Sequence, residues 1–173
     1  AKRAFCNRTG LGNYSRGVIA GVQRSAHSEG SRAVLYTPYA EPQFASYFDG
    51  VARISVRQPH GLWRCMPNTW RTLAPAQHLR TDDVRLYHGL SHELPLFLPA
   101  GVRRVVTMHD LIVRRYPHYF SLFDRIIHRV KQRHACRVAD VVVAISEQPK
   151  RALIDLMHVP EEQLRVGYQS CEP

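Results

Sequence analysis

The chain has 173 residues, of which 45% are hydrophobic and 22% are charged, and this balance predicts one soluble globular domain with a sizeable core. No apolar run approaches the roughly 20 residues that a membrane-spanning helix needs, and the first residues do not resemble a signal peptide. The four cysteines are far apart and form no Cys-x-x-Cys pair, which argues against a zinc site or a disulfide scaffold and favours free thiols in a reducing, cytoplasmic compartment.

The net charge of the chain is +10, and nearly all of its positive charge comes from arginine. Arginine suits phosphate groups because its guanidinium offers a fixed fork of donors, although genome composition explains an arginine excess equally well. The charge is compatible with nucleic acid, an anionic membrane surface or a phosphorylated substrate. No recognised nucleic-acid motif is present, so we expect no specific nucleic-acid partner.

The N-terminal region is predicted to form a strand over residues 2–6, a glycine turn, and then a helix with Val18 and Val22 on its apolar face. This order allows backbone N–H groups to meet a phosphate at the helix N-terminus. Gly10 and Gly12 would leave room for that phosphate. The spacing Gly-x-Gly-x-x-Ser lacks the third glycine of the dinucleotide fingerprint, so an ordinary turn is the alternative.

The next elements alternate between strands and helices. Strands are predicted at 33–36, 51–56 and 84–87, and an irregular helix at 61–79. The first acid after the strand at 33–36 is Glu41, which is too far along the chain to support an NAD site.

The second half begins with a buried strand at 103–108, which ends at the polar pair His109 and Asp110. The segment before it, 90–101, contains two prolines and cannot be one regular helix. Residues 111–120 are predicted to form an aromatic-rich loop or short turn.

The clearest helix is predicted over 121–138. Its apolar face contains Phe123, Ile126, Ile127, Val130 and Val138. The other faces are basic, which suits phosphates or lipid head groups, although a solvated face is the alternative; these basic residues are Arg125, Arg129, Lys131, Arg133 and Arg137.

The remaining elements are a strand at 141–145, a helix that ends near His158, and a strand at 164–168. Ser146 is predicted to be the N-cap of that helix, and Pro149 fits its first turn.

This alternation predicts an α/β fold with a parallel sheet. Polar clusters follow four of the predicted strands, and ligands bind at the carboxyl edge of such sheets. We therefore expect the clusters to converge there; they are Thr9–Tyr14, His88–Glu93, His109–Asp110 and Ser146–Glu147.

Four stretches carry a resemblance to a known family: Thr9–Arg16, Tyr87–Pro95, Val106–Ile112 and Ala139–Glu147. In order and spacing they resemble the N-terminal domain of bacterial family 4 glycosyltransferases. Val166–Pro173 is similar to the passage into the second domain of these enzymes.

The resemblance implies the GT-B fold, in which two Rossmann-like domains face a cleft. This chain would then have a Rossmann-like, mostly parallel sheet with helices on both faces. Residues 1–168 would be the N-terminal, acceptor-side domain, and residues 169–173 would begin a linker to a C-terminal donor domain. The Glu-x7-Glu motif of that second domain has no counterpart here.

The function implied by the resemblance is sugar transfer from a nucleotide-sugar donor to a saccharide or lipid-linked acceptor. It would serve the synthesis of cell-surface polysaccharide, lipopolysaccharide or glycolipid, with retention of configuration and without a metal or other cofactor. The location would be cytoplasmic, or peripheral at the inner face of the membrane. The C-terminal GT-B domain of the same protein would be needed, so this chain alone is expected to be inactive.

The resemblance also implies roles for individual residues. The catalytic candidates are His109 and Asp110, and the candidates for the donor phosphate and sugar are Gly10, Gly12 and Asn13. The acceptor side would be lined by His88, Ser91, His92 and Glu93, with Ser146 and Lys150 as further candidates. Two alternatives stay open: another GT-B enzyme, such as a nucleotide-sugar epimerase, or a non-catalytic Rossmann-like binding domain.

Overall fold

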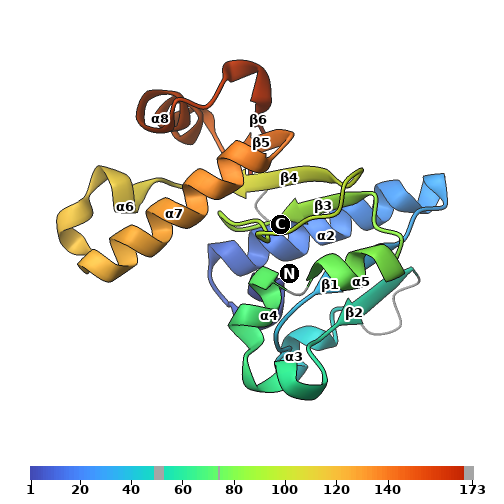
Figure 1. Cartoon of the computed structure of the whole chain (residues 1–173). Helices are drawn as coiled ribbons and strands as arrows, with labels where there is room; N and C mark the ends of the chain where they lie inside the picture. The colour runs from blue at the N-terminus through green and yellow to red at the C-terminus, as the bar shows by residue number, and fades with distance from the viewer. Residues whose placement is uncertain (49–52, 74, 170–173) are drawn as a thin grey trace. The chain divides into compact units, whose positions relative to one another are not determined.

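A computed structural model describes residues 1–48, 53–73 and 75–169 of the protein, and these residues form two compact units (Figure 1). The first unit contains residues 1–83, and the second contains residues 84–169. Each unit has its own parallel sheet. Residues 170–173 of the predicted linker lie outside the described residues.

The first unit is mainly helical around a pair of strands. Its elements are α1 (Lys2–Cys6), α2 (Gly10–Glu29), β1 (Ala33–Tyr36), α3 (Pro42–Ala45), β2 (Ile54–Arg57), η1 (Gly61–Cys65), α4 (Pro67–Leu73) and α5 (Pro75–Thr81). The two strands are parallel, with Ala33 opposite Ile54. Prolines begin both α4 and α5, which explains why the irregular helix predicted at 61–79 is divided into three short pieces.

The strand predicted at 2–6 is wrong, because these residues form helix α1. Ala4 and Phe5 are adjacent and both buried, whereas a strand would turn them to opposite faces. A neighbouring side chain stabilises the end of this short helix: Arg16 donates from Nη1 to the carbonyl oxygens of Ala4 at 3.0 Å and Asn7 at 3.1 Å. A tertiary contact therefore decides the conformation of this segment.

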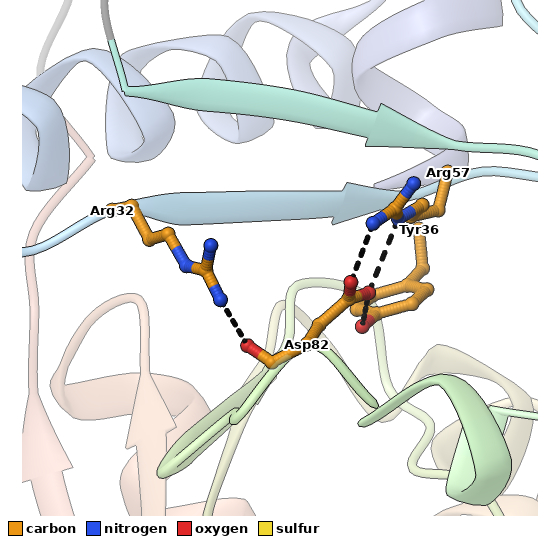
Figure 2. A network of polar contacts seen from close by, with 4 residues as sticks. All are labelled: Arg32, Tyr36, Arg57 and Asp82. Atoms are coloured by element: carbon orange, nitrogen blue, oxygen red, sulfur yellow. Dashed lines mark hydrogen bonds and ion pairs between the residues drawn. The ribbon is translucent and has the colours of Figure 1, made fainter. Parts of the chain in front are cut away.

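A polar network around Asp82 joins the end of α5 to both strands of the first unit (Figure 2). The Asp82 carboxylate, 6% exposed, accepts from the Tyr36 hydroxyl at 2.7 Å and from Arg57 Nη2 at 2.6 Å and Nε at 3.2 Å. Arg32 donates to the Asp82 main-chain oxygen at 2.8 Å. The hydrogen bond from Arg57 is the main cause that lowers the pKa of Asp82 below its usual value.

The second unit is a four-stranded parallel sheet with its helices. Its elements are β3 (Leu86–Gly89), β4 (Arg103–Met108), α6 (Ile112–Arg115), η2 (Pro117–Tyr119), α7 (Leu122–Val138), β5 (Val141–Ala144), α8 (Glu147–Met157), η3 (Glu161–Gln163) and β6 (Leu164–Val166). The strands lie in the order β3-β4-β5-β6. The α/β class and the parallel pairing are as predicted, but the described strands form two sheets rather than one.

The core of the second unit lies where α7 and α8 meet the sheet. Val106 and Met108 alternate along β4, as the period of a strand requires, and are completely buried. Ala135 of α7 and Leu153 of α8 belong to the same cluster. Both crossover helices therefore pack on one face of the sheet.

Helix α7 begins as predicted but is not buried as a whole. The Ser121 hydroxyl accepts from the Asp124 N–H at 3.1 Å and donates to the Asp124 carboxylate at 2.7 Å, which caps the helix. Its apolar face is exposed over the first half of the helix. Within the described part of the chain, no helix combines the length and the apolar character needed to cross a membrane.

Candidate functional site

His109 comes directly after β4 and is buried, with 5% of its surface exposed. Its Nε2 lies 3.0 Å from the main-chain oxygen of Leu90. Because a carbonyl oxygen only accepts, Nε2 is the donor in this contact. Nδ1 lies 3.4 Å from the Gln169 amide nitrogen, which is long for a hydrogen bond. His109 therefore contacts the loop after β3 through Nε2 and Gln169 through Nδ1.

His92 holds the main chain of His109 in place. The His109 N–H donates to His92 Nε2 at 2.9 Å, and the two rings lie 5.4 Å apart. His92 has a positive φ of 60°, and its N–H donates to the Thr107 carbonyl at 3.0 Å. The loop after β3 therefore folds over the end of β4 and brings the two histidines together, although they are far apart in the sequence.

Gly89 allows this tight loop. A Cβ atom at position 89 would lie 2.2 Å from the main-chain oxygen of Glu93 and 3.0 Å from a side-chain carbon of Leu94. No larger residue fits without moving the backbone. The glycine of the His88–Glu93 motif thus has a packing role.

His88 lies within β3, where the prediction had placed it just past the strand end. Its Nε2 is 2.9 Å from Thr107 Oγ1, and burial lowers the pKa of His88 to about 4. The imidazole is therefore neutral at pH 7. Thr107, completely buried, was not among the predicted residues, although a hydroxyl within an apolar strand could have drawn attention to it.

Three other predicted residues lie near the ends of β3 and β4, namely Ser91, Glu93 and Asp110. Ser91 is half-buried, and Glu93 forms an ion pair with Lys131 at 2.9 Å. Asp110 is exposed, and its Oδ1 accepts from the Ile112 N–H at 3.1 Å, so this carboxylate helps to start α6. A second oxygen on the Asp110 carboxylate can still meet a ligand.

Ser146 and Lys150 lie at the start of α8. Ser146 is the N-cap by position, but its hydroxyl makes no capping hydrogen bond. Lys150 forms an ion pair with Glu161 at 2.8 Å, and its side chain is 22% exposed. The structure thus gives Lys150 a contact that links α8 to η3.

Gly10, Gly12 and Asn13 lie in the first unit, in the first turn of α2, where the prediction had a turn before the helix. Position 10 is open, since a Cβ there would meet nothing within 4 Å. At position 12 a Cβ would lie 1.8 Å from the Asn7 carbonyl oxygen, so Gly12 permits the close packing of α1 on α2. Asn13 Oδ1 accepts from Arg16 Nη2 at 2.5 Å.

The structure places the candidates of His88–Glu93 and His109–Asp110 around the ends of β3 and β4, whereas Ser146 and Lys150 lie at the start of α8. Those of the first unit lie at the start of α2, and the convergence of both groups stays a prediction. Gln169, which contacts His109, gave no signal in the sequence. Among the described residues, no three His, Cys, Asp or Glu side chains form a group that could hold a metal ion. Independence from metals also stays a prediction.

A groove with a volume of about 700 Å³ opens between α6 and α8. Three arginines and two acids line it, so its charges partly offset one another; they are Arg114, Arg115, Arg151, Glu147 and Asp155. The groove was not foreseen from the sequence.

Comparison with protein families decides how this site is interpreted. The family profile described as Glycosyltransferase Family 4 matches residues 18–169. The chain belongs to glycosyltransferase family 4. No curated protein matches the chain significantly. The matched range covers both sheets and His109, whereas the start of α2 lies before it.

Membership of glycosyltransferase family 4 gives the domain a transferase role and implies a sugar donor and an acceptor as substrates. The resemblance found in the sequence is thereby confirmed at the level of the family. In this glycosyltransferase domain, His92 and His109 are in direct contact at the carboxyl end of β4, and an imidazole can donate or accept a hydrogen bond there.

Proposed function

We propose that this domain serves the transfer of a sugar from a nucleotide-sugar to a saccharide or lipid-linked acceptor, with retention of configuration, in the synthesis of cell-surface polysaccharide, lipopolysaccharide or glycolipid. The observation that carries the proposal is the state of His109. Its Nε2 proton is engaged by Leu90, while Nδ1 is directed to a long contact with Gln169. A substrate hydroxyl can replace that long contact.

His109 is the proposed catalytic residue. In the reaction, the bond between the anomeric carbon and the diphosphate oxygen breaks, and the acceptor oxygen forms the new bond to that carbon. Nδ1 of His109 can accept a hydrogen bond from a sugar hydroxyl, or guide the proton that the acceptor loses. Asp110, next in the chain and exposed, is a second candidate for meeting the acceptor.

His92 is the proposed positioning residue. Its bond to the His109 N–H fixes the backbone from which the catalytic imidazole projects. Its positive φ shows that the loop holds a conformation that residues other than glycine adopt infrequently. Ser91, Glu93 and His88 are the proposed acceptor-side residues, with Ser146 and Lys150 as further candidates.

The leaving diphosphate needs donors, for which we propose the start of α2. The first N–H groups of a helix have no acceptor within the helix, and the helix dipole favours an anion there. Position 10 is open to such a group. The hydrogen bond from Arg16 orients the Asn13 amide, whose nitrogen can also donate. We expect no metal ion in this arrangement.

The proposal is tested by comparing two histidine variants in the full-length enzyme. His109→Gln retains a donor for the Leu90 carbonyl but lacks the imidazole. His134→Gln is the matched control, because His134 Nε2 lies 3.1 Å from the Pro95 carbonyl in a similar contact. We expect His109→Gln to lower kcat roughly 100-fold and His134→Gln to leave it near the wild-type value.

Melting of both variants completes this test. Equal rates for His109→Gln and the wild-type enzyme would remove His109 from the mechanism. A large fall in the melting temperature of His109→Gln would assign the histidine a structural role. Product analysis with a panel of nucleotide-sugars distinguishes transfer to an acceptor from epimerisation, and the absence of any turnover would favour a binding domain.

A further inference from the structure

The groove between α6 and α8 lies beside the candidate site of the second unit. Helix α6 begins two residues after Asp110, and α8 begins directly after Ser146. The strands that precede these helices, β4 and β5, are neighbours in the sheet, with Met108 opposite Ala144. At the start of α8, the groove therefore lies at the carboxyl edge of the sheet. Its volume of about 700 Å³ is in the range of small-molecule sites.

One wall of the groove is a single face of α8. Glu147, Arg151 and Asp155 follow one another at intervals of four residues, so their side chains lie in a row along the helix. All three residues are exposed. Within residues 1–48, 53–73 and 75–169, these side chains take part in no ion pair. Hydrogen-bond donors and acceptors therefore alternate along this wall and are available to a ligand.

The two arginines on the α6 side of the groove have different contacts. Arg114 donates to Gln132 at 3.3 Å and to the Arg129 carbonyl at 3.4 Å, so it holds α6 against α7. Arg115 is exposed, and its guanidinium carbon lies 5.9 Å from the centroid of the Tyr116 ring. Arg115 is therefore the α6 arginine that a ligand in the groove can contact.

The charges available to a ligand in the groove are balanced. Arg115 and Arg151 supply two positive charges, and Glu147 and Asp155 supply two negative charges. This balance favours a neutral ligand that both donates and accepts hydrogen bonds over a simple anion or cation. A saccharide is such a ligand, because each hydroxyl can donate to a carboxylate and accept from a guanidinium.

Aromatic side chains follow Arg115 in the chain and extend this surface. The rings of His118 and Tyr119 lie 4.2 Å apart, and those of Tyr116 and Tyr119 lie 6.4 Å apart. Tyr116 is 43% exposed and Tyr119 is 77% exposed. Such rings offer an apolar face to the C–H groups of a sugar, while the tyrosine hydroxyls remain in water. The aromatic cluster is thus compatible with the same class of ligand as the groove.

We propose that the groove between α6 and α8 binds a sugar unit of the acceptor. Glu147 and Asp155 accept hydrogen bonds from its hydroxyls, and Arg115 and Arg151 donate to them. Among the described residues that line the groove, neither His109 nor Asp110 is found, so this sugar is not the unit that reacts.

The acceptor is then a saccharide of two or more units. The enzyme extends a chain that an earlier glycosyl transfer has begun. This inference rests on the proposed transfer reaction and adds to it the class of acceptor.

Transfer to sugars of different length tests the inference in the full-length enzyme. The acceptors are neutral disaccharides of glucose, galactose and mannose, each paired with the methyl glycoside of its non-reducing sugar. The readout is the ratio of kcat/KM between the two members of a pair. We expect wild type to prefer the disaccharide about tenfold or more, because contacts remote from the reacting unit add binding energy. Asp155→Asn and Arg151→Gln should each lower this preference roughly tenfold.

Glu162→Gln and Arg103→Gln are the matched controls. Glu162 lies in η3 and Arg103 lies at the amino end of β4, and both are exposed. Both variants should keep the wild-type preference for the disaccharide. A general defect in folding lowers kcat/KM for both members of a pair alike, so the ratio reports on the groove.

The possible outcomes separate this inference from the proposed function. Equal rates on both members of every pair would overturn the inference and leave the transfer reaction in place. An unchanged preference in Asp155→Asn and Arg151→Gln would have the same meaning. Transfer to a lipid-linked sugar but to no free disaccharide would refute the acceptor class. The absence of turnover with every donor and acceptor would reject the proposed transfer itself.

Asp155→Asn also distinguishes a saccharide from an anion. Loss of this negative charge should weaken the binding of a neutral sugar but strengthen the binding of an anion. Calorimetric titration of the full-length enzyme with the preferred disaccharide, and separately with inorganic phosphate, measures both. We expect Asp155→Asn and Arg151→Gln to weaken disaccharide binding alike. If instead phosphate binds more tightly to Asp155→Asn and less tightly to Arg151→Gln, with no change for the disaccharide, the groove is an anion site and the inference fails.

Discussion

The imidazole of His88 is partly buried against Thr107 of the neighbouring strand β4, and this burial makes the stability of the second unit depend on pH. Burial lowers the pKa of His88 from 6.5 to about 4. Between pH 6.5 and 4, His88 is protonated in the unfolded chain but neutral in the folded chain. The free energy of unfolding therefore falls as the pH falls toward 4, and it changes little below that pH. The loss can reach about 3 kcal/mol.

Urea unfolding at a series of pH values checks this prediction. His88→Gln cannot titrate, so its free energy of unfolding should vary less between pH 6.5 and 4 than that of wild type. His118, which is exposed, offers the matched control His118→Gln, which should keep the wild-type slope. A slope for His88→Gln equal to that of wild type would show that His88 is not the group responsible.

At the scale of elements, the Asp82 network joins three pieces of the first unit. The carboxylate holds Tyr36 at the end of β1 and Arg57 at the end of β2 from a position just after α5. Asp82→Asn removes the charge that Arg57 meets, and we expect it to lower the free energy of unfolding by about 1–3 kcal/mol at neutral pH. The partly exposed Arg57 limits the loss, because solvent screens its side of the pair.

Thermal melting against pH measures this effect. Because the pKa of Asp82 is lowered in the folded state, its contribution is present above the ordinary pKa of an aspartate and is lost as the pH falls through the folded value. The two melting temperatures should therefore converge in acid. Asp83→Asn is the control, since Asp83 is adjacent and exposed and should melt like wild type at every pH. A neutral-pH melting temperature unchanged by Asp82→Asn would refute the structural role.

The elements that the sequence predicted well are those whose own residues decide their structure. The apolar run at β4 and the amphipathic pattern of α7 each specify a local conformation, and both elements were found as predicted. Residues 2–6 were misread because Arg16, distant in the sequence, supplies the contacts that stabilise α1. Periodicity likewise showed an apolar face on α7 but not whether anything covers it.

The candidate site was predictable to a similar degree. His109 could be singled out because it ends an apolar strand, and the structure confirms that position. Its contacts with Leu90 and Gln169 were not predictable, since both depend on how the chain returns to the end of β4. The pairing of His92 with His109 likewise depends on the loop conformation, whereas the contact of Thr107 with His88 depends on the pairing of β3 with β4.

At the scale of the whole molecule, we propose that the donor is held mainly by a second, C-terminal domain, as the resemblance to family 4 glycosyltransferases implies. We predict that this chain by itself shows no detectable turnover of nucleotide-sugars and binds them weakly, because few contacts remain to offset the entropy lost on binding. Calorimetric titration with a panel of nucleotide-sugars, together with a product assay, measures both quantities. Turnover by the 173-residue chain would show that the donor site is complete within it.

The unequal burial of α7 also has a consequence for how this protein can diverge. Substitutions in the second half, at positions such as Ala135 and Cys136, must satisfy the packing of the core and are limited by folding. Substitutions at Phe123 or Ile126 cost little in folding, since these side chains are largely in water already. Selection can therefore change the exposed face of the first half while the core of the second unit stays as it is, so that related proteins can differ at this surface and keep the same fold.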